Sequence, residues 1–186
     1  ASDVYKRQDA DFAKAAAGIV AAGFFNAGQD CTAATRLLVH ERAYDNFMAA
    51  LLAEVKNSAK VGMPHEEDIL FGPLNNANQL SRVKGFIDRL PDHAKIEAGG
   101  NLIAGNGYFL EPTVLSGFKQ TDEQIQEEIF GPVVSVTSFS DYDDAIRIAN
   151  DTLYGLGAGV WSRNGNVAYR AGRDIKAGRV WTNCYH

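Results

Sequence analysis

Segments with the pattern of helices alternate with segments with the pattern of strands, and this alternation restricts the fold more than any other feature. Apolar residues recur every three to four positions over residues 11–25 and 44–55, which predicts two amphipathic helices. Between them, residues 36–40 hold a short apolar run typical of a buried strand. Further helices are predicted over residues 80–90, 142–150 and 166–176, and further strands over residues 95–97, 108–115, 132–139, 157–161 and 179–183. Because parallel strands need crossover connections, this order predicts a layered α/β domain with a mainly parallel sheet.

Composition narrows the classes of partner and compartment. The 186 residues carry 18 Lys and Arg against 23 Asp and Glu, a net charge of −5 without basic clusters, which argues against nucleic acid as a partner. The longest apolar run, residues 15–25, is shorter than the roughly 20 residues that a membrane-spanning helix needs. Neither the four histidines nor the two cysteines, Cys31 and Cys184, have the spacing of a metal site or a disulfide framework. Since no secretory signal pattern is present either, the cytoplasm is the predicted compartment.

The first candidate for chemistry is a cysteine inside the sequence FFNAGQDCT, residues 24–32. Cys31 follows a turn predicted at residues 26–28 and precedes residues 32–36, which are predicted to open a short helix. A thiol at a helix N-terminus is favoured as the thiolate by the helix macrodipole and by free backbone N–H groups. The alternative is a small buried apolar residue, which is the commoner role of a lone free cysteine.

The second candidate is the sequence QEEIFGPV, residues 126–133, in which two carboxylates lead into an aromatic residue, a Gly-Pro turn and a Val-rich strand. Glu128 is suited to accept two hydroxyl hydrogens of a ribose, as acidic residues do in dinucleotide sites. Phe130 offers a flat apolar wall to a ring. The alternative is a solvated acidic pair in front of a strand.

Together the two motifs resemble those of the aldehyde dehydrogenase superfamily. The resemblance continues, in the family's order, through NDTLYGL at residues 150–156, GVWS at 159–162 and GRVWTN at 178–183, and it covers about residues 9–186. It implies the family's layered α/β catalytic domain, truncated at both ends. It also implies that Cys31 adds to an aldehyde as a thiolate, that hydride passes to NAD or NADP, and that water hydrolyses the resulting thioester.

The same resemblance implies further roles. Glu128 would hold the nicotinamide ribose, and Phe130 would pack near the nicotinamide. On a looser pattern, Gln79 and Arg82 lie in a helix where the family can touch the adenosine ribose. No residue is expected to bind a metal.

The chain also departs from the family pattern. It holds no Glu-Leu-Gly-Gly-type segment roughly three dozen residues ahead of Cys31, where the family has its general base, and no preceding cofactor domain. Residues 1–8 do not resemble the family's buried strand and are predicted to be an extraneous or artefactual leader, which leaves residues 9–186 as a partial catalytic domain. We therefore expect this chain alone to be inactive, and the full-length protein to be a homodimer or homotetramer.

Two parts of the sequence give different indications about the substrate. Residues 25–32 resemble the aminoaldehyde group, which oxidises γ-aminobutyraldehyde or betaine aldehyde, whereas residues 180–186 look more like enzymes for short aliphatic aldehydes. The expected partner is a small-molecule aldehyde, with an aminoaldehyde as one candidate. Two other interpretations remain: a truncated, non-catalytic relative that acts as a binding or structural subunit, and an acylating relative, which the Glu128 motif disfavours.

Overall fold

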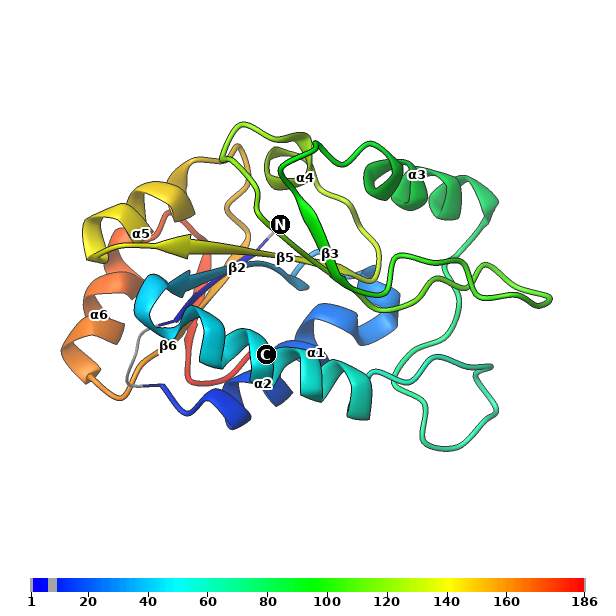
Figure 1. Cartoon of the computed structure of the whole chain (residues 1–186). Helices are drawn as coiled ribbons and strands as arrows, with labels where there is room; N and C mark the ends of the chain where they lie inside the picture. The colour runs from blue at the N-terminus through cyan, green and yellow to red at the C-terminus, as the bar shows by residue number, and fades with distance from the viewer. Residues whose placement is uncertain (1, 7–9, 186) are drawn as a thin grey trace.

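The computed structural model describes residues 2–6 and 10–185, which form a seven-stranded sheet with helices on both faces (Figure 1). The helices are α1 (Phe12–Phe24), α2 (Tyr44–Ser58), α3 (Ala77–Asp88), α4 (Glu123–Gln126), α5 (Tyr142–Asn150) and α6 (Gly165–Asp174), with short 3₁₀ segments η1 (Phe25–Gly28) and η2 (Glu41–Ala43). The strands are β1 (Ser2–Lys6), β2 (Ala34–His40), β3 (Lys95–Ala98), β4 (Thr113–Ser116), β5 (Val133–Phe139), β6 (Gly157–Trp161) and β7 (Arg179–Thr182). Their order is β3-β4-β5-β2-β1-β6-β7, and only β3 runs antiparallel to its neighbour. The predicted layered α/β fold with a mainly parallel sheet is confirmed.

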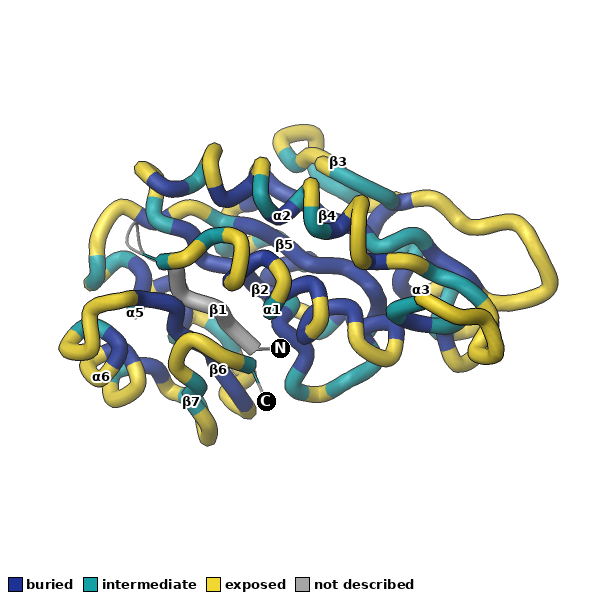
Figure 2. The backbone as a smooth tube through the Cα atoms, turned by 90° about the horizontal axis from the view of Figure 1, so that it is seen from below, coloured by how far each residue is buried: buried dark blue, intermediate teal, exposed yellow. Residues whose placement is uncertain are grey.

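Alternate residues of β2 enter separate cores on the two faces of the sheet, because successive side chains of a strand point to opposite sides. Leu37 and Val39 belong to a core shared with α1, α2 and α3, whereas Leu38 belongs to one formed with α5 and α6. Figure 2 shows the middle strands β2 and β5 largely buried. Burial on both faces explains why β2 has a continuous apolar run rather than an alternating pattern.

Helix α1 fixes the start of the loop that carries Cys31. The carboxylate of Asp11 caps the helix by accepting the backbone N–H of Lys14 at 3.1 Å. At the other end, fully buried Phe24 stacks on Phe71 with ring centroids 6.1 Å apart. The predicted helix and its end near residues 26–28 are confirmed. The loop that follows begins next to Phe24, which is anchored in the core.

Several of the predicted bounds differ from the structure, and three of these differences have a clear physical cause. Residues 32–36, which are predicted to open a helix, form a turn that runs into β2. Of the strand predicted over residues 108–115, only Thr113 and its successors join the sheet, since Pro112 has no N–H to donate to a ladder. Helix α3 begins earlier than the predicted residue 80, because Asn76 caps it by accepting the N–H of Gln79 at 2.9 Å.

Strand β1 corrects the exclusion of residues 1–8 from the fold. Ser2–Lys6 pairs in parallel with β2 on one side and with β6 on the other, in the interior of the sheet. The segment lacks the continuous apolar run that predicts a central strand, but ladder hydrogen bonds use backbone groups that every non-proline residue carries. Exclusion from the fold is therefore wrong for Ser2–Lys6. The foreign origin of this segment stays a prediction, and residues 1 and 7–9 lie outside the described residues.

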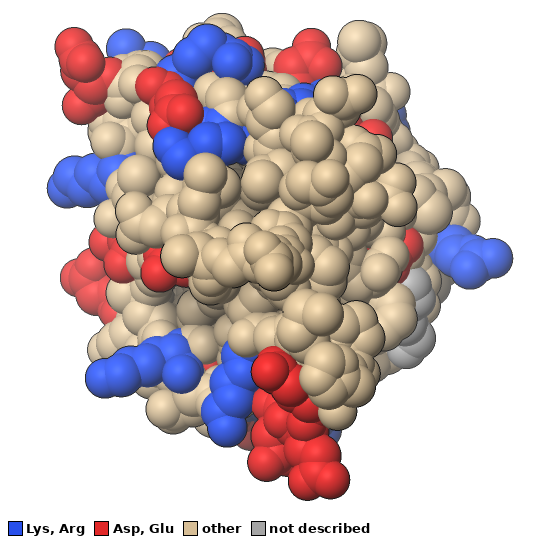
Figure 3. Space-filling view, turned by 90° about the vertical axis from the view of Figure 1, so that its right-hand side faces the viewer, with Lys and Arg blue, Asp and Glu red and all other residues tan. Residues whose placement is uncertain are grey.

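Two long loops, residues 59–76 and 99–112, extend from one end of the molecule (Figure 1). Figure 3 faces this end and shows uncharged side chains in its middle, with charged side chains mostly around the rim. A groove of about 380 Å³ between the loops is lined by residues that include Val61, Met63, Ile103 and Phe109. None of the residues that line this groove belongs to either of the two motifs.

Candidate active site

Cys31 lies in the turn between η1 and β2, and its side chain is exposed. Asp30 closes this turn: its carboxylate accepts the backbone N–H of Thr32 at 3.0 Å and the Thr32 hydroxyl at 3.1 Å. Such aspartate-led turns compete with helix formation. The predicted helix over residues 32–36 is therefore wrong, and with it the helix macrodipole at Cys31. The exposed position of Cys31 also rules out the alternative role of a buried apolar residue.

The backbone ahead of Cys31 is left-handed at successive residues. Asn26, Ala27 and Gly28 have φ of 51°, 56° and 68°. Side chains brace this turn, since the amide of Asn26 donates to the carbonyl of Gln29 at 3.0 Å, and the amide of Gln29 donates back to the carbonyl of Asn26 at 3.1 Å. Non-glycine residues persist in this conformation only where the surroundings hold them, and functional sites are where such residues gather.

The structure brings the two motifs together at one edge of the sheet. Strands β2 and β5 are parallel neighbours, so the loops that enter them, with Cys31 in one and Glu128 in the other, lie at the same edge. The loops touch at Gly28 and Gly131, where a Cβ on Gly28 would lie only 1.9 Å from the carbonyl oxygen of Gly131. No side chain fits between these two backbones, so the contact requires glycine at position 28.

Glu128 and Phe130 are both half-buried, and Phe130 has a left-handed backbone with φ of 58°. Helix α3 lies against this segment. The amide of Gln79 donates to the carbonyl of Phe130 at 2.7 Å, and the guanidinium of Arg82 donates to the carbonyls of Glu128 at 2.6 Å and Ile129 at 2.5 Å. The two helix residues thus contact the backbone of the second motif, a role that the sequence does not predict for them.

A pocket of about 310 Å³ lies beside the cysteine turn. It is lined by Ala21, Ala22, Phe25, Asp30 and Tyr185. Its wall is mostly apolar and holds one carboxylate, that of Asp30, which directly precedes Cys31. Tyr185 belongs to the C-terminal stretch, where its ring lies 4.9 Å from that of Trp181. The second cysteine, Cys184, is also exposed.

Shifted pKa values are found at Tyr44 of α2 and at Asp144 of α5. Burial raises the pKa of Tyr44, and hydrogen bonding by the backbone N–H of Ser140 lowers the pKa of Asp144. Within residues 2–6 and 10–185, no three or more His, Cys, Asp or Glu side chains are grouped so that they could hold a metal ion. In the same part of the chain, no helix is long and apolar enough to cross a membrane.

A family model described as the aldehyde dehydrogenase family matches residues 4–186. The chain belongs to the aldehyde dehydrogenase family. The resemblance inferred from its motifs is therefore confirmed, and the match includes part of β1.

Individual family members agree with this assignment. The EPTC-inducible aldehyde dehydrogenase of Rhodococcus erythropolis is 50% identical over 169 residues, which cover 87% of this chain and 32% of that protein. The long-chain-aldehyde dehydrogenase of an Acinetobacter species is 48% identical over 164 residues, with coverage of 87% and 32%. The crystal structure of lactaldehyde dehydrogenase from Escherichia coli superposes with a TM-score of 0.95 at 34% identity, covering 100% of this chain and 39% of that one. The chain thus spans between about a third and two fifths of the length of these aldehyde dehydrogenases.

Some contacts of this candidate site are not predicted from the sequence. Asn75 donates its backbone N–H to the side-chain oxygen of Gln29 at 2.8 Å, which links the start of α3 to the loop of Cys31. Nothing in the sequence pattern signals that bond. Gly131 contacts Gly28 and also lies against Val83 of α3, where a Cβ on Gly131 would come within 2.6 Å of a Val83 methyl group. The Gly-Pro turn is visible in the sequence, but the partners that require its glycine are not.

Proposed function

We propose that this chain is the nucleophile-bearing part of an enzyme that oxidises an aldehyde to a carboxylic acid with NAD or NADP. The observation that carries this proposal is the contact of Gly28 with Gly131, which holds the loop of exposed Cys31 against the loop of Glu128 and Phe130. Two solved relatives support the cofactor, because their crystal structures contain bound NAD: 1-pyrroline-5-carboxylate dehydrogenase from Thermus and betaine aldehyde dehydrogenase from Staphylococcus aureus. The latter superposes with a TM-score of 0.93 at 34% identity, covering 100% of this chain and 37% of that one.

The residues of the second motif fit the ribose end of such a cofactor. The half-buried carboxylate of Glu128 has two acceptor oxygens, which suit the neighbouring hydroxyls of a ribose. Half-buried Phe130 adds an aromatic ring on the same loop. When bound, the dinucleotide supplies the acceptor for a hydride.

Cys31 performs the covalent part of the proposed reaction. Its thiolate sulfur forms a bond to the aldehyde carbon, and the carbonyl π electrons move to the oxygen, toward which the backbone N–H of Cys31 donates. As this oxyanion collapses, the carbon loses a hydride and becomes the acyl carbon of a thioester on Cys31, so the substrate is oxidised. Water then adds to the thioester, the sulfur leaves as thiolate, and the carboxylic acid is released.

Hydrolysis of the thioester needs a general base that the two motifs do not contain. The family resemblance assigns it to a Glu-Leu-Gly-Gly-type segment, and the 186 residues hold no such segment. We therefore propose that this chain alone does not turn over aldehyde, and that it works within a longer homodimeric or homotetrameric enzyme. Its two free cysteines support a reducing compartment such as the cytoplasm.

An aminoaldehyde such as γ-aminobutyraldehyde is the proposed substrate. The pocket beside the cysteine turn supports this choice, because the carboxylate of Asp30 shares it with Phe25 and Tyr185. A carboxylate and aromatic rings together favour a cationic amine over a neutral alkyl chain. Among the relatives, the betaine aldehyde dehydrogenase of Staphylococcus aureus supports this substrate class, whereas the long-chain-aldehyde dehydrogenase of Acinetobacter does not.

The test uses a family-length enzyme, made by placing this chain in the Rhodococcus erythropolis relative instead of its matching region. Cys31→Ser is expected to lower kcat at least about a thousandfold, because a nucleophile is lost. The matched control Cys184→Ser removes the other exposed thiol and is expected to stay within about twofold, as its sulfur has no role in the proposed chemistry. Equal losses in the two variants would contradict the assignment of Cys31.

Substrate class is tested in the same enzyme with 4-aminobutanal and acetaldehyde. Asp30→Asn is expected to lower kcat/KM for 4-aminobutanal roughly tenfold while leaving acetaldehyde within about twofold, because a single charge contact is lost. Equal turnover of both aldehydes by the unchanged enzyme would refute the aminoaldehyde assignment. The alternative of a binding subunit predicts that the 186-residue chain itself binds NAD tightly, which a stability-shift titration would detect.

A further inference from the structure

One face of helix α3 lies along the whole segment that leads into β5. The residues of that face, separated by three, one and three positions, are Gln79, Arg82, Val83 and Phe86. The first two bond the backbone of residues 128–130, and Val83 lies against Gly131. The helix therefore backs the loop of Glu128 and Phe130 rather than facing away from it.

Arg82 and Gln79 together donate hydrogen bonds to successive backbone carbonyls of that loop. Arg82 donates to the carbonyls of Glu128 and Ile129 from two different nitrogens, and Gln79 donates to the carbonyl of Phe130. Hydrogen bonds from a guanidinium are charge-assisted, and its planar fork fits two acceptors at once. The loop needs such support, because Phe130 has a left-handed backbone that non-glycine residues rarely adopt.

The guanidinium of Arg82 is itself oriented by the helix. Its central carbon lies 4.9 Å from the centroid of the Phe86 ring, one helical turn further on. Arg89 lies over the same ring at 5.5 Å, but its guanidinium pairs with Glu123 at 3.1 Å, and within residues 2–6 and 10–185 it makes no hydrogen bond to the carbonyls of residues 128–130. Both arginines thus lie over the Phe86 ring, but Arg82 bonds the backbone of residues 128–129 whereas Arg89 pairs with Glu123.

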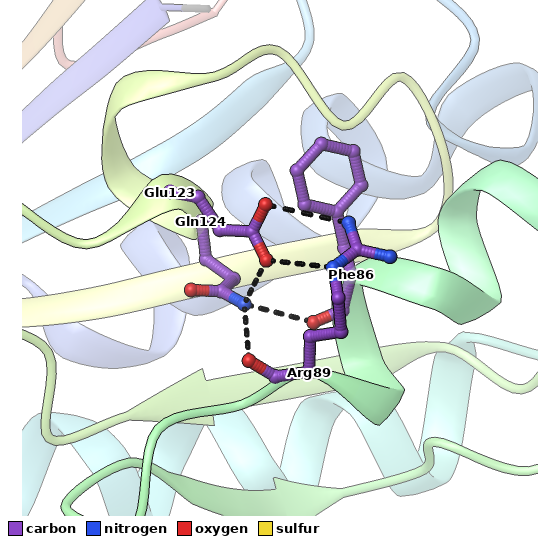
Figure 4. A network of polar contacts seen from close by, with 4 residues as sticks. All are labelled: Phe86, Arg89, Glu123 and Gln124. Carbon is purple, nitrogen blue, oxygen red and sulfur yellow. Dashed lines mark hydrogen bonds and ion pairs between the residues drawn. The ribbon is translucent and has the colours of Figure 1, made fainter.

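The C-terminal half of α3 fastens the other end of the same segment, as Figure 4 shows. The side-chain amide of buried Gln124 donates to the carbonyls of Phe86 at 2.9 Å and Arg89 at 3.3 Å, while Glu123 pairs with the Arg89 guanidinium. Glu123 and Gln124 belong to α4, which ends at Gln126, shortly before Glu128. Both ends of this segment, residues 123–124 and 128–130, are therefore bonded to α3.

The same helix is tied to the loop of Cys31. The N–H of Asn75, next to the Asn76 cap, donates to the side chain of Gln29 at 2.8 Å, and Gln29 lies in the turn that precedes Cys31. Helix α3 thus contacts both loops that meet at the Gly28–Gly131 contact.

We propose that Arg82, assisted by Gln79, is a positioning residue that acts through the backbone of residues 128–130. It holds the loop so that Glu128 and Phe130 are presented to the dinucleotide. The ordering of the loop is independent of the enzymatic assignment, whereas its effect on cofactor binding rests on the proposed function.

The first measurement is ¹⁵N backbone relaxation on the 186-residue chain. In the unchanged chain, the order parameters of Ile129, Phe130 and Gly131 are expected near 0.85, the value of rigid backbone, and in Arg82→Met below about 0.6. The matched control Arg89→Met removes the other cation over Phe86 and the pair with Glu123, which lies in α4 and outside residues 128–130, so the order parameters of Ile129, Phe130 and Gly131 should stay near 0.85. Arg82→Lys retains a donor and should give intermediate values. Unchanged order in Arg82→Met would overturn the proposal.

The second measurement uses the family-length enzyme that carries this chain. Arg82→Met is expected to raise KM for NAD about tenfold or more while kcat at saturating NAD and KM for aldehyde stay within about threefold, because the chemical step does not involve Arg82. If Arg82→Met lowers the order parameters of residues 129–131 without changing KM for NAD, Arg82 still orders the loop, and the cofactor role of Glu128 and Phe130 is refuted. Equal changes in every kinetic parameter would overturn the positioning role, since they indicate general damage.

Discussion

Replacement of Gly28 by alanine probes the contact that joins the two motifs. A non-glycine residue in the left-handed conformation costs about 1–2 kcal/mol, and residue 28 has φ of 68°. The added Cβ would also lie 1.9 Å from the oxygen and 2.4 Å from the carbonyl carbon of Gly131. Both partners are backbone, so no change of rotamer relieves the overlap, and overpacking of this kind costs about 1–3 kcal/mol. We expect Gly28→Ala to lower the free energy of unfolding by about 2–5 kcal/mol.

Two control variants separate the contributions of strain and overlap. Gly105 has a positive φ of 146° but nothing within 4 Å of the added Cβ, so Gly105→Ala measures backbone strain alone, about 1–3 kcal/mol. Gly165, at the start of α6, has neither feature, so Gly165→Ala is expected to change stability by less than about 1 kcal/mol. Urea titration with an unchanged m-value reports each difference. A loss in Gly28→Ala no larger than that in Gly105→Ala would refute the argument from overlap.

Three other changes test the packing and electrostatics of the fold. Phe24→Ala should lower the free energy of unfolding by about 3–5 kcal/mol, since Phe24 is fully buried, whereas Phe25→Ala should cost less than about 1 kcal/mol in the same urea titration, because Phe25 is 61% exposed. Asn150→Leu should cost about 1–3 kcal/mol by urea titration, because it removes bonds to two backbone groups at the end of α6. Asp144 has a lowered pKa in the folded chain, so it stabilises the fold above its ordinary value of 3.8 and loses that contribution as the pH falls through the lowered pKa. Thermal melting against pH should therefore show Asp144→Asn less stable than the unchanged chain at neutral pH, with the gap closing in acid, and a constant gap would contradict the lowered pKa.

The elements that sequence reasoning predicts well are those whose signals are local. Helix α1 has an apolar stripe and a capping Asp11, and glycine appears where the helix ends, so all its signals lie within the segment itself. Strand β5 is equally clear, because its valines form a run of high strand propensity. For such segments the pattern is sufficient, since each is stabilised in the way that its own residues favour.

Features that depend on partners distant in sequence are not predicted. Ser2–Lys6 has no apolar run, and its place in the sheet depends on the backbone edges of β2 and β6. The turn after Cys31 depends on one carboxylate, that of Asp30, which takes the N–H of Thr32. The order β5-β2-β1 places strands far apart in sequence next to each other. Apolar patterns indicate which residues are buried, but not which strand pairs with which.

For the candidate site too, the sequence predicts which residues take part but not how they are arranged in space. Cys31, Glu128 and Phe130 are recognisable because the motifs require those chemical groups. Their proximity follows only once β2 and β5 are known to be neighbours, and the role of Arg82 only once α3 is known to lie against residues 128–130. Exposed charged residues usually serve solubility, so an arginine on a helix gives no signal of such a role.

The edge of the sheet at which the site lies has a chemical consequence. Open parallel sheets usually bind ligands beyond the carboxyl ends of their strands, where helix N-termini also point. Here Cys31 and Glu128 precede β2 and β5, so both lie at the amino ends of these strands, and no helix begins directly after Cys31. A helix macrodipole therefore does not contribute to the reactivity proposed for Cys31. Under the proposed function, the turn closed by Asp30 and the contact of Gly28 with Gly131 set the position of the thiol, and α3 supports the neighbouring loop.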